Sequence, residues 1–247
     1  VPQVVKVEMT DAAYEEFKTP ILYPGTYFAH LLGRTDVVGC ESNVLLYAGC
    51  SGMAKTDLVA QIVATSQSFY PSGVNIRFTT DSVVGQVKNV LVQCDYSTNA
   101  PLGETANDQI AFPNAVPSGT AYVNMNIIRK DSSEEKFLYE NGVMHPVQFA
   151  QSEIPTLFPF SAINLAHAVS STTTHETGHL LGLVSDVYFG GRDSHNANTV
   201  INGWMMNKGD YTPAVYHLGT NTNRQRTWKS TNAKYLQFIL PTKAEVN

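Results

Sequence analysis

Apolar and polar positions alternate with different periods along the chain, and they divide it into helices and strands from Met53 onward. Apolar residues recur at helical spacing at Leu58, Val59, Ile62, Val63 and Phe69, and Pro71 ends the run. Segments 74–80 (VNIRFTT), 89–97 (NVLVQCDYS) and 120–128 (TAYVNMNII) predict strands. A helix containing HETGH and a last helix in 226–240 follow. This order predicts an α+β fold with a mixed sheet.

The first 50 residues lack this periodicity. They are rich in proline, glycine and aromatic residues, as in TPILYPGTYFAHLLG, which is typical of irregular structure with short strands. We therefore expect residues 1–50 to be an accessory segment, or the remnant of a pro-segment, packed on a main domain of residues 51–247.

Composition narrows the class of protein. The chain has 247 residues, 43% of them hydrophobic, which is enough for one compact domain or two closely packed lobes. The net charge is −5 and the basic residues are scattered, so nucleic acid is not expected as a partner. The apolar runs fall short of the ~20 residues that span a bilayer. We expect a monomer without a membrane span.

Three cysteines leave the redox state open. Cys40 and Cys50 are ten residues apart and could close a small loop by a disulfide, which would leave Cys94 unpaired and would suit an oxidising compartment. Three reduced, buried thiols are an equally good interpretation. A third possibility is a thiolate that caps a metal in a latent form.

The motif His175-Glu176-Thr177-Gly178-His179 carries the clearest chemistry. Histidines four apart on a helix are separated by ~400° of rotation and ~6 Å of rise, so both imidazoles leave the same face and can bind one ion. Glu176 lies beside the first ligand, where its carboxylate can take a proton from water on that ion. This pattern predicts a zinc site with a general base.

Glycines flank this motif. Gly178 and Gly182 each cost ~1 kcal/mol in a helix interior relative to alanine. For Gly182 that cost is avoided if the residue ends the helix in a left-handed turn. We therefore predict that the helix ends there and that the chain folds back towards the metal.

The combination His175-Glu176-x-x-His179-x-x-Gly182, with NGWMMNKGD downstream, resembles the metzincin clan of zinc endopeptidases. The resemblance covers residues 172–210. It implies a two-lobed catalytic domain with a mixed sheet, an active-site helix, one catalytic zinc ion and a methionine-containing turn under the zinc. Met206 is the residue that we place in that turn.

The third zinc ligand does not follow the common spacing. Three residues after Gly182 stands Ser185, a poor zinc ligand. His195 is our choice, because imidazole is a commoner zinc ligand than carboxylate and the glycines of FGGRD would let a loop return to the metal. Asp186 is the alternative, and Asp193 is a weaker one in a deuterolysin-like arrangement.

These features predict a secreted or periplasmic zinc endopeptidase that cleaves protein or peptide substrates by water attack. The alternatives are a catalytically silent metzincin fold used for binding and a non-peptidase zinc amidase. We expect a peptide to bind along an edge strand, for which segment 119–126 is the candidate, although it could equally be an interior strand. Tyr211 or Tyr216 could contact the metal or the oxyanion. The other histidines are assigned core or surface roles.

Overall fold

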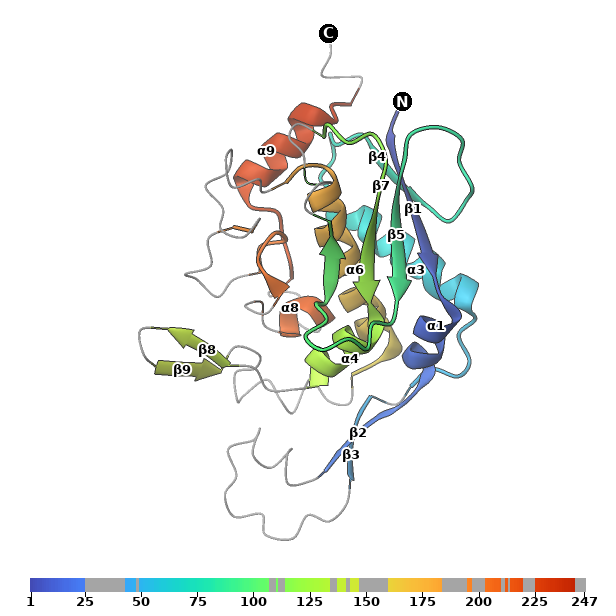
Figure 1. Ribbon diagram of the computed structural model, residues 1–247, viewed down its shortest axis with the longest axis vertical. Helices are drawn as coiled ribbons and strands as arrows, with labels where there is room; N and C mark the ends of the chain where they lie inside the picture. Colours follow the sequence, from blue (N-terminus) through green and yellow to red (C-terminus); the bar gives the residue numbers. More distant parts are fainter. Residues whose placement is uncertain are drawn as a thin grey trace.

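The computed structural model describes residues 1–24, 43–47, 49–106, 110, 114–133, 137–140, 143–146, 160–183, 195–196, 203–209, 212, 214–219 and 225–242. A five-stranded sheet in the order β4-β1-β5-β7-β6 forms its centre (Figure 1). The strands are β1 (Gln3–Met9), β4 (Ile76–Thr79), β5 (Val87–Gln93), β6 (Gly103–Thr105) and β7 (Gly119–Asn124). Neighbouring strands are parallel except β6, which runs antiparallel to β7. The expected α+β class with a mixed sheet is confirmed.

Helices α3 (Lys55–Phe69) and α6 (Ala162–Leu180) pack against each other and against the sheet, behind which they lie in Figure 1. The other elements are α1 (Asp11–Lys18), β2 (Ile21–Pro24), β3 (Asn43–Tyr47), α4 (Met125–Ser133), β8 (Phe137–Glu140), β9 (Val143–Pro146), α8 (Ala214–Leu218) and α9 (Ser230–Ile239). The helices predicted after Met53 and within 226–240 correspond to α3 and α9.

Three expectations need correction. Strand β1 lies between β4 and β5 with Val5, Val7 and Met9 buried, so the start of the chain is part of the sheet and not an accessory segment. Segment 119–126 is not an edge strand but an interior one, which was the other interpretation, because β7 pairs with β5 and β6; the edges of the described sheet are β4 and β6. The predicted strand 120–128 ends at Asn124, and Met125 and Ile128 are both buried at helical spacing in α4.

Helix α6 is buried along nearly its whole length, although its middle is the polar run Ser170–Thr177. Hydroxyl groups in such a run normally compete with the helix for backbone partners. Here the hydroxyls bond the carbonyl four residues earlier, at 2.8–3.1 Å, in Ser170, Thr172, Thr174 and Thr177. Ser161 and Asn164 form a capping box at the start of the helix. These four hydroxyls are therefore satisfied within the helix, and Ser171 accepts a hydrogen bond from Arg226, which helps the polar run to cross the core.

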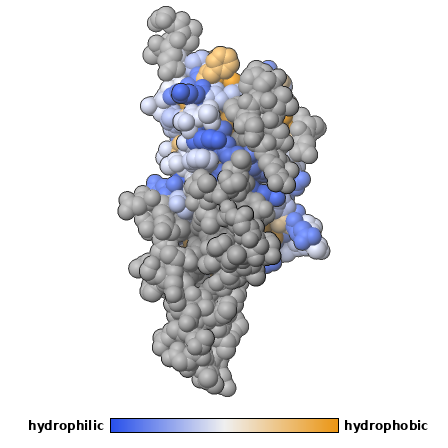
Figure 2. Space-filling view, turned by 90° about the vertical axis from the view of Figure 1, so that its left-hand side faces the viewer, coloured by the Kyte–Doolittle hydropathy of each residue, from blue (hydrophilic) through white to orange (hydrophobic). Residues whose placement is uncertain are grey.

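The described surface is polar on the face shown in Figure 2, where blue and white areas predominate over a small orange patch. Exposed large apolar residues belong to separate parts of the chain, for example Val84, Ile163 and Phe238. In the described residues, no helix combines the length and the apolar character that crossing a bilayer requires.

Lys88 in β5 provides a stability prediction. Its side chain is fully buried, Nζ donates to the carbonyl of Val116 at 2.7 Å, and burial lowers the pKa of Lys88 to about 8. The unfolded chain therefore binds more protons than the folded chain between these pKa values, and stability rises with pH in this window. We expect the free energy of unfolding to rise by about 1 kcal/mol between pH 7 and pH 9 through this group.

Urea denaturation at the two pH values measures this increment. Lys88→Met removes the titrating amine and should remove the increment, whatever its effect on absolute stability. An equal rise with pH in parent and variant would show that another group is responsible.

Candidate metal centre

The C-terminal end of α6 carries the two histidines of the motif. Gly182 adopts φ +84°, its N–H donates to the carbonyl of His179 at 2.8 Å, and Leu183 N–H donates to the carbonyl of Gly178 at 2.9 Å. These two bonds form a Schellman motif. The predicted left-handed end at Gly182 is therefore confirmed, and it brings the carbonyl of Leu183 back towards His179.

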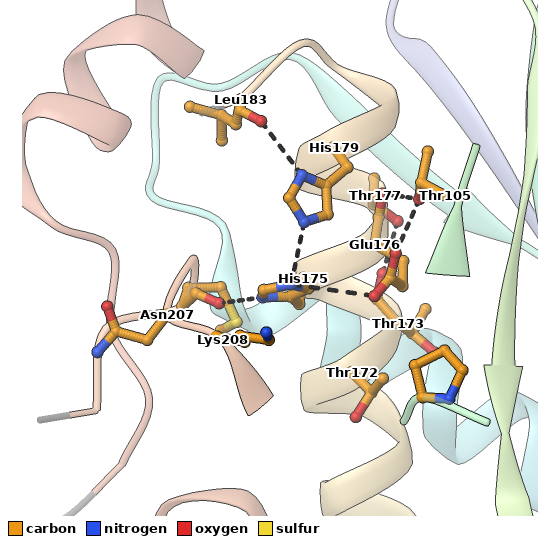
Figure 3. Close-up of polar contacts among 12 residues, drawn as sticks. Thr105, Thr172, Thr173, His175, Glu176, Thr177, His179, Leu183, Asn207 and Lys208 are labelled. Carbon is orange, nitrogen blue, oxygen red and sulfur yellow. Dashed lines mark hydrogen bonds and ion pairs between the residues drawn. The ribbon is translucent and has the colours of Figure 1, made fainter. Parts of the chain in front are cut away.

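Backbone carbonyls orient both imidazoles (Figure 3). Nδ1 of His175 lies 2.6 Å from the carbonyl oxygen of Met205, and Nδ1 of His179 lies 3.3 Å from that of Leu183. A carbonyl only accepts, so each Nδ1 carries the hydrogen and each Nε2 presents a lone pair. This is the arrangement in which a histidine binds a metal through Nε2.

The two Nε2 atoms lie 3.1 Å apart, and neither carries a hydrogen that could join them. Two ligands at ~2.0–2.1 Å from a tetrahedral ion would be separated by ~3.3 Å. The observed Nε2–Nε2 distance is therefore close to the distance that a shared metal ion requires. A cation between the two rings would bind both lone pairs, which otherwise repel each other.

His195 completes the cluster. One ring nitrogen from each of His175, His179 and His195 lies within 4.8 Å of the other two, so the three could hold one metal ion. The next residue, Asn196, fixes this segment: its N–H donates to the carbonyl of Met206 at 3.0 Å and its side-chain amide to Asn232 of α9 at 3.2 Å. Asp186, the alternative ligand, lies outside the described residues, as do Ser185, Asp193, Tyr211 and Cys40.

Burial keeps the first two imidazoles neutral. Desolvation lowers the pKa of His179 to about 3 and holds the pKa of His175 well below its usual range, and the neighbouring histidines add to both effects. Both residues are 5% exposed or less. Neutral imidazole is the form that binds a metal, so the protein environment favours the ligating state at neutral pH.

Glu176 lies beside the cluster and is held by the edge strand. Its Oε1 is 3.9 Å from Nε2 of His175, and its Oε2 accepts a hydrogen bond from Oγ1 of Thr105 in β6 at 2.8 Å. Burial raises the pKa of Glu176 to about 8, and the bond from Thr105 opposes that rise. A divalent cation held by the histidines would stabilise the carboxylate form further.

Protein-family models, curated proteins and solved structures were all compared with the chain. None of them matches it. The geometry of the site therefore carries the functional argument.

A buried guanidinium lies beneath His175. Nη2 of Arg226 donates to the carbonyl of Met205 at 2.5 Å, the same oxygen that accepts from His175, and Nη1 donates to Oγ of Ser171 at 3.2 Å. Burial lowers the pKa of Arg226 to about 9, so the group stays charged at neutral pH. Arg226 therefore fixes the carbonyl that orients a candidate ligand.

Met206 is fully buried against the helix. A Cβ added at Gly178 would meet its Sδ at 2.6 Å, so the sulfur occupies the space that the missing side chain leaves on the surface of α6. Tyr216 packs over Gly203, where a Cβ would lie 2.3 Å from its ring. The absence of a side chain at Gly178 thus allows Met206 to approach α6, and its absence at Gly203 allows Tyr216 of α8 to pack there.

A cavity of about 470 Å³ opens beside Glu176 and two of the histidines, His175 and His195. Its wall includes Leu102 and Gly103 at the start of β6, Lys208 after the methionine pair, and His217 of α8. The sequence assigned His217 a core or surface role and gave no role to Thr105, Arg226 or Lys208. Thr105 and Arg226 make their contacts across long sequence separations, which no local motif records.

Gly103 offers a test of how Glu176 is placed. A Cβ at this position would come within 2.6–2.9 Å of the Glu176 side chain. We expect Gly103→Ala to displace the carboxylate and to lower the rate of any reaction that uses it about 100-fold, as misplacement of a catalytic group by ~1 Å does. Metal content should stay unchanged, because the histidines are not touched.

Gly52→Ala is the matched control, since a Cβ there meets no atom within 4 Å. Its rate should equal that of the parent. Metal loss from Gly103→Ala would show instead that the substitution disturbs the whole helix end.

Proposed function

We propose that the chain is a zinc-dependent endopeptidase of metzincin-like architecture. The observation that carries the proposal is the convergence of three imidazoles with a glutamate carboxylate 3.9 Å from one of their ligating nitrogens. Three histidines leave one position of a tetrahedral ion open, as in catalytic zinc sites, whereas structural sites have four protein ligands. Imidazole ligands suit zinc, although they also suit copper, iron and nickel.

Zinc held by these histidines would supply Lewis acidity and lower the pKa of a coordinated water towards ~7. Glu176 is the base that takes the proton and later passes it to the leaving amine. Thr105 binds Oε2, which leaves Oε1 facing the histidines. A catalytically silent binding module would have no use for a carboxylate placed in this way.

The edge strand supports a polymeric substrate. Within the described sheet, β6 pairs with β7 on one side only, and its first residue lines the cavity. An extended peptide can add to such an edge by main-chain hydrogen bonds. This replaces the expectation that segment 119–126 binds the peptide, and it brings the peptide alongside Glu176. Export from the cytoplasm remains part of the proposal.

The test combines metal analysis with cleavage. We expect the purified chain to contain about one zinc ion and to cut casein at internal bonds, to lose both on chelation and to regain both with zinc. N-terminal sequencing of the products identifies endopeptidase cleavage. Zinc binding without cleavage of casein, gelatin or a peptide library would support the binding module, and hydrolysis of small amides alone would support the amidase.

A further inference from the structure

The described wall of the cavity beside the candidate metal centre carries more basic than acidic residues. Lys208 and Arg226 line it as cations, and Glu176 is the one acidic residue among the described residues of its wall. A divalent ion on the three histidines would add two further positive charges. The space next to the reacting bond therefore attracts anions.

The two cations have different surroundings. Arg226 is 3% exposed, and its guanidinium donates to backbone carbonyls and to Ser171. Lys208 is partly buried, and in Figure 3 its side chain extends towards α6 below His175. An ammonium on a flexible stem can follow a ligand, whereas the guanidinium supplies a fixed field behind it.

Part of the cavity wall is apolar. Pro101 and Leu102 contribute apolar surface, and Leu102 packs against Gly209, where an added Cβ would lie 2.4 Å from its Cδ1. An aliphatic stem that ends in a carboxylate suits a cavity whose wall combines this apolar surface with an ammonium group.

We propose that this cavity is a subsite for a carboxylate of the substrate, bound by Lys208 in the field of Arg226, so that the enzyme selects peptides with an acidic group next to the scissile bond. The proposal rests on the proposed function, which it deepens by naming a substrate class. The carboxylate could belong to a glutamate or aspartate side chain or to the end of the peptide chain.

Matched peptides test the proposal. The casein sequence that is cut fastest is synthesised with glutamate or glutamine at each of the two positions on either side of the cleaved bond, with amidated and with free C-termini. For the parent we expect kcat/KM to be about ten-fold higher with glutamate at one position, as a charge-assisted hydrogen bond provides. A preference confined to the free C-terminus would identify the chain end as the source of the carboxylate.

Two variants assign the effect to Lys208. Lys208→Gln should abolish the preference, so that the glutamate and glutamine peptides have about the same kcat/KM. Lys208→Glu should reverse it in favour of a peptide with lysine at the same position. Lys234→Glu, the same charge change at an exposed position of α9, should keep the parent preference. Equal cleavage of the glutamate and glutamine peptides by the parent, or a preference that survives Lys208→Gln, would overturn the subsite.

Calorimetric binding of glutamate and glutamine versions of one fixed peptide sequence, chosen independently of any cleavage, to the Glu176→Gln protein separates this proposal from the proposed function. Tighter binding of glutamate peptides that depends on Lys208, with no cleavage by the parent, would keep the subsite and remove the endopeptidase. If the glutamate and glutamine peptides are neither bound nor cleaved, both the subsite and the endopeptidase activity are overturned.

Discussion

Glu176→Gln is expected to keep its zinc and to lose about 10²–10⁴-fold in kcat, the range that a general base contributes. The amide has nearly the same shape as the carboxylate and can still accept the hydrogen bond from Thr105 through its oxygen. It cannot take a proton from water at neutral pH. The three histidines keep their positions, so zinc content should match the parent. Metal analysis together with kcat/KM on a fluorogenic casein peptide measures both quantities.

Glu104→Gln is the matched control, because Glu104 is an exposed neighbour on β6 that also acts electrostatically on Glu176. Its rate should stay within a few-fold of the parent. A Glu176→Gln enzyme that cleaves as fast as this control would remove the general base from the mechanism.

His195→Ala is expected to lower zinc affinity more than about 100-fold and to abolish cleavage, since loss of an outer-shell partner alone costs about 10–100-fold. The remaining ligands, His175 and His179, would hold the ion with two bonds. Competition with a zinc-binding dye measures the affinity, and cleavage at saturating zinc shows whether added metal restores the rate.

Asp186→Ala distinguishes the two ligands that the sequence leaves open. It should keep both zinc and activity. If it loses both while His195→Ala keeps them, then Asp186 is the ligand and His195 has a supporting role.

Sequence patterns predicted the parts of the fold that depend on neighbours along the chain. Helix α3 follows from apolar residues at helical spacing. The end of α6 follows from Gly182, because glycine adopts the left-handed conformation of this turn without strain. The grouping of His175 and His179 follows from the helical period. The choice of His195 followed from two observations. Ser185 is a poor zinc ligand, and the glycines before His195 would allow a loop to bring its imidazole back to the metal.

Sequence patterns could not show the features that depend on contacts between residues far apart in the chain. Strand β6 has only three residues, too few to display alternation, so its role as the edge strand was not visible and β7 was chosen in its place. The change from strand to helix at Met125 lies inside one apolar run. Thr105 lies 71 residues from Glu176, and Arg226 lies 51 residues from His175, so neither contact has a local signature.

The hydrogen bond between Asn196 and Asn232 bears on when the site forms during synthesis. Asn196 adjoins the third histidine, and its partner belongs to α9, which follows all three histidines and Glu176 in the chain. A nascent chain that has not yet released α9 from the ribosome lacks this support, and we expect it to bind the metal weakly. Tight metal binding would then require that α9 has docked. The growing chain would have no cleavage activity while nearby proteins are still folding.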